Sequence, residues 1–360
     1  MIRLRPLSEQ TVVVMGASSG IGREAARQLA AKGARVVVSA RDEDALKSLA
    51  EEISAHGGQA LAVAADTTVA EEVEAVADRA AERFGGIDTW VQTAAVAVYA
   101  RFDATTLGEF RRVVEVNLLG AVVAAKTALP HLRRRGQGAL VVVSSVEARR
   151  SFPYHSAYAA AKHGLDGFLE ALRVELHQEG VPISVTNVLP GSINTPLFDK
   201  ARTKLGVKPM PIPPIYQPTT IARLIVHAAE HPARDLIGGG AAKALLLNQR
   251  LSPRMLDAFL VRFGFRTQRS DQPKSEHDGD NLFGPMPGMG QVEGSFSRGA
   301  WRHSAYNRLE TAAPWRRMGA VLSGPPRFRD RSEPARPSGE TATARSRETA
   351  TAASGAVTQP

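Results

Sequence analysis

The sequence predicts an α/β fold in which a doubly wound, mostly parallel sheet of seven strands carries helices on both faces. Two observations predict it. Short β-branched runs, such as residues 12–14 and 36–38, are continuously apolar, as expected of strands that are buried on both faces. Segments with helical periodicity separate these runs along residues 11–238. Strands that alternate with helices form right-handed parallel β–α–β units, and such units build this kind of sheet.

The first predicted elements extend to residue 93. The first helix is expected to end at Gly33, because glycine adopts the left-handed conformation that is common at helix C-termini. In the second helix, Leu46, Leu49 and Ile53 recur at helical spacing. In order, the predicted elements are strand 11–14, helix 20–32, strand 35–39, helix 43–56, strand 60–64, helix 69–84 and strand 88–93.

The remaining elements complete the expected sheet. A long helix ends in the arginine cluster 133–135, whose charges oppose the helix dipole. The apolar run at 140–143 predicts another buried strand. In order, these elements are helix 107–134, strand 139–144, helix 156–179, strand 183–188, helix 221–230 and a short last strand at 235–237. Helices at 241–250 and 253–264 are expected to follow them.

The composition excludes several classes of protein. The chain has 360 residues, of which 43% are hydrophobic and 22% charged, and it contains no cysteine. Disulfide scaffolds, cysteine-ligated metal sites and thiol nucleophiles are therefore excluded. No apolar run approaches the length of a membrane span, and the first ten residues lack the apolar stretch of a signal peptide. We expect a cytoplasmic protein without a transmembrane segment.

The basic residues are spread along the chain. The formal net charge is +9, but the basic clusters are short and lie only at 133–135 and 327–331. A nucleic-acid-binding protein would present a basic stripe on a recognisable module, so no nucleic-acid partner is expected. No group of histidines has the spacing of a metal site, so no metal is expected.

A glycine-rich loop, MGASSGIG at residues 15–22, joins the first strand to the first helix. Gly16 permits a tight turn, Gly20 lets a pyrophosphate approach the backbone, and Gly22 lets the helix pack closely on the sheet. Phosphates bind at such helix N-termini because free N–H groups point at them. The strand–loop–helix context therefore predicts a dinucleotide site.

The end of the second strand distinguishes between two dinucleotides. An acidic residue there would bind the ribose 2′-hydroxyl of NAD and repel a 2′-phosphate. This chain instead has Arg41, whose planar guanidinium can pair with a phosphate. We expect NADP(H) in preference to NAD(H); the alternative is that Arg41 is an ordinary surface residue. Asp66, after the third strand, is expected to accept a hydrogen bond from the adenine amino group, to cap a helix, or to do both.

Tyr158 and Lys162 lie one turn apart on one face of a predicted helix. Tyrosine, with an ordinary pKa near ~10, is a poor acid–base group at neutral pH. An adjacent ammonium lowers that pKa, and a positively charged oxidised nicotinamide would add to the effect. Ser145 closes the fifth strand, where it could hold a substrate carbonyl. Asn117 stands among apolar neighbours in the long helix, as a structural kink or an anchor for a water molecule.

Taken together, these motifs resemble the short-chain dehydrogenase/reductase (SDR) family over about residues 7–240, which implies a Rossmann-type fold. Two parts of the sequence depart from the family pattern. Met15 replaces the usual threonine, and residues 92–95 are QTAA where the family has NNAG. The features that carry the resemblance are the glycine loop, Asn117, Ser145, Tyr158, Lys162 and the segment PGSINTP at 190–196, which is similar to the PGxxxTP of that family.

The resemblance implies an oxidoreductase with a defined set of roles. Tyr158 would be the general acid/base, and Lys162 would lower its pKa and bind the nicotinamide ribose. Ser145 would orient the carbonyl, and Asn117 would help to hold a proton-relay water. The resemblance also implies a homodimer or homotetramer. Ile193 and Thr195 would lie against the nicotinamide carboxamide. The full set of residues expected to bind the cofactor is Gly16, Ser18, Ser19, Gly20, Ile21, Gly22, Arg41, Asp66, Thr67, Ala94, Asn117, Tyr158, Lys162, Pro190, Gly191, Ile193 and Thr195.

Four regions are expected along the chain. Residues 1–240 would form the dinucleotide-binding catalytic domain, and the helices in 241–265 would pack on it. A long C-terminal extension follows. Residues 266–322 include a stretch rich in Gly, Pro, Asp and Ser and are expected to be poorly ordered. Residues 323–360 are low in hydrophobic residues and are expected to form a disordered tail.

The substrate is expected to be a bulky, fairly hydrophobic ketone, aldehyde or secondary alcohol. The loops that would line the pocket are mostly apolar, and the proline-rich segment 191–218 is expected to act as a lid that excludes water. The alternative is that these side chains only pack the lid on the core. Two other functions stay open: a non-catalytic dinucleotide sensor or scaffold on the same fold, and a nucleotide-sugar epimerase on a related fold.

Overall fold

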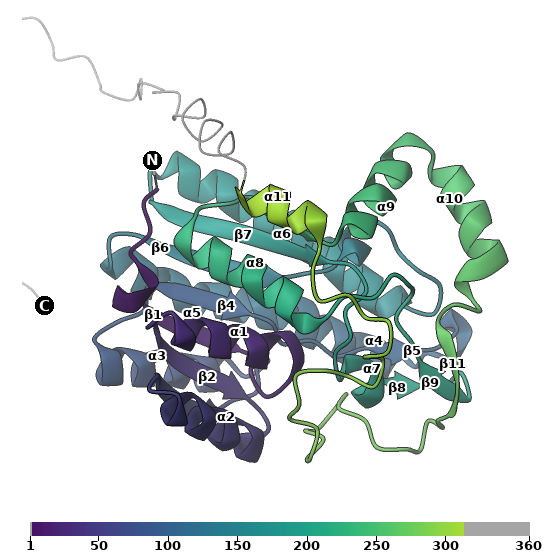
Figure 1. Ribbon diagram of the computed structural model, residues 1–360, viewed down its shortest axis with the longest axis horizontal. Helices are drawn as coiled ribbons and strands as arrows, with labels where there is room; N and C mark the ends of the chain where they lie inside the picture. Colours follow the sequence, from purple (N-terminus) through teal and green to yellow (C-terminus); the bar gives the residue numbers. More distant parts are fainter. Residues whose placement is uncertain (1, 313–360) are drawn as a thin grey trace, which may run out of the picture. The chain divides into compact units, whose positions relative to one another are not determined.

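A parallel sheet of seven strands forms the centre of the protein (Figure 1). The structure is a computed structural model, and it describes residues 2–312. The strand order is β10-β7-β6-β4-β1-β2-β3, and every neighbouring pair is parallel. This confirms the predicted fold class. The strands are β1 (Thr11–Met15), β2 (Arg35–Ala40), β3 (Gln59–Ala64), β4 (Thr89–Gln92), β6 (Gly138–Val143), β7 (Ile183–Pro190) and β10 (Asp235–Gly238).

The inner strands are buried on both faces. In β1, Val12 and Val14 belong to one apolar core, and Val13 and Met15 belong to the other, because successive side chains alternate across a strand. A strand of this kind needs apolar side chains at every position. This explains why the strands appear in the sequence as continuous β-branched runs rather than alternating ones.

Helices cover both faces of the sheet (Figure 1). Helices α1, α2 and α8 pack into one core, and α3, α5 and α6 pack into the other. Each buries an apolar stripe; that of α2 is the predicted set Leu46, Leu49 and Ile53. The bounds are α1 (Gly20–Ala31), α2 (Glu43–Ala55), α3 (Ala70–Phe84), α4 (Leu107–Val114), α5 (Gly120–Arg134), α6 (Ser156–Gln178) and α8 (Pro218–Glu230).

The helix predicted over 107–134 is interrupted. A π-helical turn, Glu115–Leu119, separates α4 from α5 and contains Asn117. By length and composition alone this stretch is apolar enough to cross a membrane, which is weak evidence for a membrane span. Its Ala121, Ala124 and Ala128 are buried in the core beneath the sheet, as in the core helix of a compact domain.

The chain between β7 and α8 forms a lid, residues 191–217. It contains α7 (Leu197–Lys200), β8 (Arg202–Thr203) and β9 (Val207–Pro209). Strand β8 pairs with β5 (Val98–Tyr99), so the lid is tied to the loop that follows β4. This pairing places the lid over the carboxyl edge of the sheet.

The C-terminal extension packs on the lid and the sheet through residue 312, whereas the sequence predicts poor order from residue 266. Helices α9 (Gly240–Leu251) and α10 (Pro253–Phe259) match the predicted ones. Strand β11 (Arg269–Pro273) then pairs with β9 of the lid. Helix α11 (Ala305–Ala312) is attached through Asn307, whose side chain bonds to the backbone of Ile237 and Gly239.

Hydrogen bonds to the rest of the protein explain why residues 266–312 are more ordered than their composition predicts. The extension has few apolar residues of its own, so it cannot form a separate core. Parts of its backbone instead hydrogen-bond to the lid and the glycine loop, and one leucine, Leu282, is fully buried. Residues 274–297 are called the strap below. The predicted tail at 323–360, and residues 313–322, lie outside the described residues.

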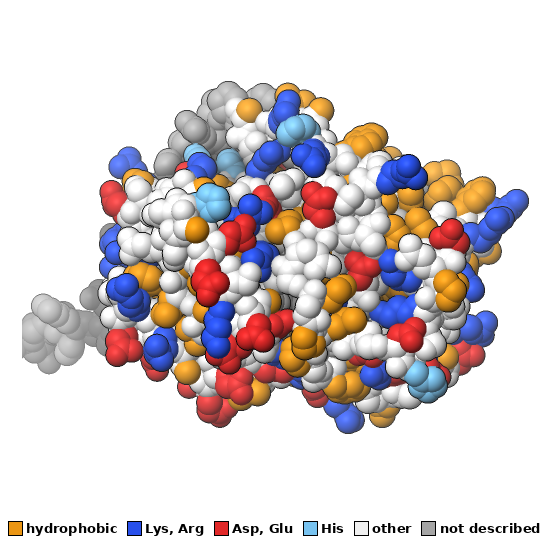
Figure 2. Space-filling model, turned by 60° about the horizontal axis from the view of Figure 1, so that its bottom comes forward, with side chains coloured by type: hydrophobic (Ala, Val, Ile, Leu, Met, Phe, Trp, Pro, Cys, Tyr) orange, Lys and Arg blue, Asp and Glu red, His pale blue; other side chains and the backbone are white. Residues whose placement is uncertain are grey.

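Acidic and basic side chains are interspersed on the face that Figure 2 shows. Many of the charged groups are paired, as in the contact of Arg149 with both Asp166 and Asp235. The net positive charge is therefore distributed rather than gathered on that face.

Candidate active site

One cavity lies at the carboxyl edge of the sheet, bounded by the glycine loop, α6, the lid and the strap. Parallel strands end at the same edge, which is where such sheets bind ligands. Asn117 does not line this cavity, whereas the other predicted site residues do. Those that line it are Gly16, Ser18, Ser19, Gly20, Ile21, Gly22, Arg41, Asp66, Thr67, Ala94, Ser145, Tyr158, Lys162, Pro190, Gly191, Ile193 and Thr195.

The glycine loop is packed too closely for side chains at two of its glycines. Gly16 has a φ of +81°, and a Cβ there would lie 2.5 Å from the backbone nitrogen of Ala94. At Gly22 a Cβ would lie 2.3 Å from the carbonyl oxygen of Gly16. Helix α1 can therefore approach the loop only because residue 22 is glycine. Its N-terminus forms part of the cavity wall, where a helix favours negatively charged groups.

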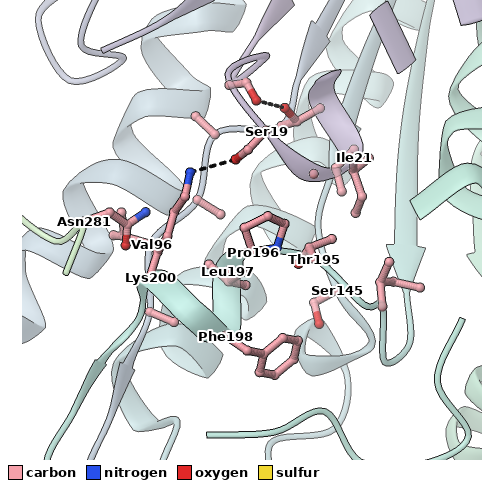
Figure 3. A pocket seen from close by; sticks show the side chains of 18 of the residues that line it. Ser19, Ile21, Val96, Ser145, Thr195, Pro196, Leu197, Phe198, Lys200 and Asn281 are labelled. Atoms are coloured by element: carbon pink, nitrogen blue, oxygen red, sulfur yellow. Dashed lines mark hydrogen bonds between the residues drawn. The ribbon is translucent and has the colours of Figure 1, made fainter. Parts of the chain in front are cut away.

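Lys200 of the lid lies opposite the glycine loop (Figure 3). Its Nζ donates a hydrogen bond to Ser19 Oγ at 2.9 Å. Burial lowers the pKa of Lys200 to about 8, although Asp42 opposes the shift. Nothing in the sequence marks Lys200 as a site residue, because a single lysine in a proline-rich segment forms no motif. Its position beside the N-terminus of α1 adds positive charge where a phosphate would bind.

Arg41 is only 20% exposed in its side chain, unlike an ordinary surface arginine. Its Nη2 donates to the backbone carbonyl of Asn281 at 2.7 Å. Its Nη1 is buried without a hydrogen-bond partner, 3.9 Å from a carboxylate oxygen of Asp66. A guanidinium donor is thus left unsatisfied at the end of β2, at the predicted position.

Asp66 is held by its neighbours and does not cap the following helix. Helix α3 begins after Val69, and the Asp66 carboxylate instead accepts hydrogen bonds from Thr68 and, at 2.7 Å, from Arg112. Burial favours the neutral form of Asp66, but these hydrogen bonds outweigh it and lower its pKa. The helix-cap alternative is therefore wrong, and a charged carboxylate lines the cavity.

The structure accommodates the departures at residues 92–95. Gln92 donates a hydrogen bond to Thr67 Oγ1 at 3.0 Å, which links β4 to the loop after β3. Thr93 Oγ1 donates to the Met15 carbonyl at 2.7 Å, which links β4 to the glycine loop. These side chains tie together the loops around the cavity.

Tyr158, Ser145 and Lys162 converge in the cavity. Tyr158 is 9% exposed, and Ser145 hydrogen-bonds to its hydroxyl. Lys162 lies one turn along α6, with its Nζ 5.4 Å from the centre of the Tyr158 ring. That Nζ donates to the carbonyl of Val143, at the end of β6, at 3.0 Å. Strand β6 and helix α6 thus bring the predicted catalytic residues together.

The electrostatics of Tyr158 differ from the expectation. Burial raises the pKa of Tyr158 well above its ordinary value, the Glu147 carboxylate raises it further, and only the hydrogen bond with Ser145 opposes the change. Burial lowers the pKa of Lys162 to about 8. In this structure Tyr158 is therefore a protonated phenol at neutral pH, which is the form that donates a proton.

Asn117 fastens the interrupted helix to the loop after β4. Its Nδ2 donates to the carbonyls of Val96 and Val113, both at 2.8 Å, and its Oδ1 accepts from the Val96 N–H. These bonds satisfy backbone groups around the π-helical turn. Asn117 is expected from the sequence either to form a structural kink or to anchor a water molecule, and these bonds support the structural kink.

A buried pair, Glu147 and His155, borders Tyr158. Glu147 Oε1 lies 2.7 Å from His155 Nδ1, and the His155 ring packs 5.8 Å from that of Tyr158. Glu147 Oε2 and His155 Nε2 are both buried without a hydrogen-bond partner. Glu147 could not be predicted as a site residue, although it follows Ser145 by two residues, because one glutamate after a strand is not a motif.

The extension supplies further lining residues that the sequence analysis missed. Gln268, Asn281, Pro285 and Met286 all face the cavity. Gln268 is buried, and its amide donates to the carbonyls of Pro153 and Gly264. These residues reach the site through contacts across the sequence, so no local pattern marks them.

The burial of Lys162 has a consequence for folding. Between pH 8 and about 10 the unfolded chain holds the lysine proton that the folded protein has released, so stability rises with pH. We expect the unfolding free energy of the wild type, minus that of Lys162→Met, to rise by about 2 kcal/mol over this range. Denaturant unfolding of both proteins at several pH values measures this difference. Lys200 also titrates in this range, but it is present in both proteins, so its contribution cancels when the two free energies are subtracted. A difference that is flat or falls with pH would contradict the account.

Three expectations stay predictions: the homo-oligomer, the cytoplasmic location and the absence of a metal. Among residues 2–312, no group of three or more His, Asp or Glu side chains is arranged to hold a metal ion.

Comparisons with known proteins agree with this geometry. The model of the short chain dehydrogenase family matches residues 10–206. An uncharacterized oxidoreductase of Bacillus subtilis, YxnA, is 36% identical over 315 residues, 87% of this chain and 88% of its own. That match is longer than the part of the chain before the extension, so it includes part of the extension. The 3β-hydroxysteroid dehydrogenase 1 of Eggerthella lenta is 36% identical over 53% of this chain and 73% of its own.

Two solved structures are similar to a large part of this chain. An alcohol dehydrogenase from Thermococcus sibiricus, complexed with 5-hydroxy-NADP, has a TM-score of 0.56 and 27% identity over 63% of this chain and 95% of its own. A variant of the actinorhodin polyketide ketoreductase, with NADPH, has a TM-score of 0.57 and 29% identity over 64% of this chain and 96% of its own. The chain is therefore a dinucleotide-dependent oxidoreductase, and it belongs to the short-chain dehydrogenase/reductase family.

Proposed function

We propose that the protein uses NADP(H) to interconvert a carbonyl and a secondary alcohol on a fairly hydrophobic substrate, with Tyr158 as the general acid/base. One observation carries this proposal: the glycine loop, Arg41 and the group of Tyr158, Ser145 and Lys162 line a single cavity. The two similar structures hold 5-hydroxy-NADP and NADPH, which supports the choice of cofactor.

The residues present fit a phosphorylated dinucleotide. The unsatisfied Nη1 of Arg41 calls for an acceptor such as a 2′-phosphate. Lys200, Ser19 and the N-terminus of α1 would hold the pyrophosphate, and Thr195 would lie near the nicotinamide carboxamide. When bound, the reduced dinucleotide supplies a hydride to the carbonyl carbon.

Side chains of the protein would bind the substrate carbonyl oxygen and supply its proton. Ser145 donates a hydrogen bond that orients the substrate carbonyl, and Tyr158 gives its proton to the oxygen as negative charge develops there. The phenol of Tyr158 is protonated at neutral pH and can donate, and burial raises its pKa further above the ordinary value. Lys162 places positive charge near the phenolate that remains.

The apolar part of the cavity favours bulky substrates. It is built from the loop after β4, the turn after β6 and the lid, including Phe198 (Figure 3). The hydroxysteroid and the polyketide in the names of two similar proteins support this size class. The apolar lining residues are Val96, Tyr99, Val146, Phe152, Leu197, Phe198, Met210 and Ile212.

A substrate comparison tests this part of the proposal. With NADPH, we expect kcat/KM for a decalone, a bulky apolar ketone, to exceed that for pyruvate by about 100-fold, because apolar surface is buried on binding. Phe198→Ala should reduce that ratio, whereas Phe259→Ala on the exposed α10 should not. Turnover of small charged ketones alone would overturn the hydrophobic assignment.

A further inference from the structure

The strap is fastened to the lid by several polar contacts. The ammonium of Lys274 donates to the backbone carbonyls of Asp199 and Ala201, at the end of α7. Asp280 pairs with Arg202 at 2.8 Å. The contacts recur at the other end of the strap, where residues 294–297 hydrogen-bond to the lid. The strap is therefore a fixed wall beside the cavity.

The strap also contacts the two elements expected to bind the dinucleotide. The carbonyl of Asn281 accepts the 2.7 Å hydrogen bond from Arg41, at the end of β2. The carbonyl of Gln291 accepts a 3.0 Å bond from the N–H of Gly20, at the start of α1. Leu282, next to Asn281, is fully buried in the apolar cluster that includes Tyr158. The extension thus closes the side of the cavity that lies between the glycine loop and β2.

Two polar atoms in this part of the cavity lack hydrogen-bond partners, although Arg41 Nη1 lies 3.9 Å from the Asp66 carboxylate. Arg41 Nη1 is a buried donor and Asn281 Oδ1 is a buried acceptor, and neither makes a hydrogen bond. Both residues line the cavity. Buried polar groups usually have a hydrogen-bond partner, and a ligand atom in the cavity could supply one to each of these two. The ligand that complements them carries an anionic acceptor beside a hydroxyl donor, which describes a phosphorylated ribose.

We propose that Asn281 is a cofactor-binding residue supplied by the C-terminal extension, and that it distinguishes NADP(H) from NAD(H) together with Arg41. Its backbone carbonyl holds the guanidinium in place, and its carboxamide contacts the phosphorylated ribose. This inference rests on the proposed function, because it needs a dinucleotide in the cavity. It gives the extension a direct part in cofactor selection.

The backbone and the side chain of Asn281 make different contacts, so the role of the side chain can be tested by substitution. Its backbone attaches the strap, through the bond from Arg41 and a 3.0 Å bond from its own N–H to the Lys200 carbonyl. Its side-chain oxygen has no partner in the protein. A substitution therefore changes the carboxamide while the attachments of the strap remain.

The test is Asn281→Asp in the full-length protein. A carboxylate would repel a 2′-phosphate but not a 2′-hydroxyl, so we expect the ratio of the Kd for NADH to the Kd for NADPH to fall at least about tenfold. Calorimetric titration measures both constants without turnover. Asn248→Asp makes the same change on the exposed surface of α9 and should leave the ratio as in the wild type.

A second variant keeps the proposal testable if Asn281→Asp does not fold. Asn281→Ser keeps the site neutral and shortens the side chain, and it should weaken NADPH binding about threefold or more through the lost hydrogen bond. If Asn281→Asp is folded and keeps the wild-type ratio, or if Asn281→Ser binds NADPH as tightly as the wild type, the assignment is overturned. Failure of the wild type to bind either dinucleotide would instead overturn the proposed function.

Discussion

Replacing Tyr158 with phenylalanine is expected to lower kcat by about a thousandfold, because it removes the hydroxyl that gives its proton to the substrate oxygen in the proposed mechanism. The ring and its packing stay, since Tyr158 is buried among apolar neighbours. Steady-state kinetics with NADPH and a bulky ketone measure the loss.

Binding separates the loss of chemistry from a loss of structure. The Kd of Tyr158→Phe for NADPH should stay within about threefold of the wild type, because the change acts on the transition state. Tyr306→Phe removes a phenolic hydroxyl in α11, outside the cavity, and should keep wild-type turnover. A Tyr158→Phe enzyme that retains a tenth or more of the wild-type kcat would refute the role of Tyr158.

Replacing Arg41 with glutamine should raise the Kd for NADPH by about 30-fold, since a hydrogen bond to a charged group contributes about 2 kcal/mol. The Kd for NADH should change little, because a 2′-hydroxyl needs no positive charge. The bond from Arg41 to the Asn281 carbonyl is lost with the guanidinium, but the strap keeps its contacts from Lys274 and Asp280 to the lid. Calorimetric titration with each dinucleotide measures the change.

The control for Arg41 is an exposed arginine on another helix. Arg79 of α3 is 61% exposed in its side chain, so Arg79→Gln removes the same charge away from the cavity and should leave both constants unchanged. An equal loss of affinity for NADH and NADPH in Arg41→Gln would show that Arg41 supports the fold and does not read the 2′-position.

The sheet could be predicted from the sequence because burial on both faces imposes a visible pattern. Every residue of β1 must be apolar or small enough to fit one of two cores, so the run is continuous. The break at 115–119 could not be predicted in the same way. Apolar residues continue through it, and the bonds from Asn117 that stabilise it reach the loop after β4.

The catalytic group could be predicted because its chemistry fixes local spacing. Tyr158 and Lys162 must share one helix face, and the glycines must stand where no side chain fits. The positions of Lys200 and Asn281 follow no fixed local spacing in the sequence. They meet Ser19 and Arg41 only after the lid and strap have packed, and their own segments show merely the polar, proline-rich composition of loops.

Calorimetric titration of the full-length wild-type protein with NADPH and, separately, with NADH measures the cofactor preference directly. Arg41 and Asn281 would both act on the phosphorylated ribose, so we expect the Kd for NADPH to be at least about tenfold lower than that for NADH. Tighter binding of NADH, or no binding of either dinucleotide, would contradict the account.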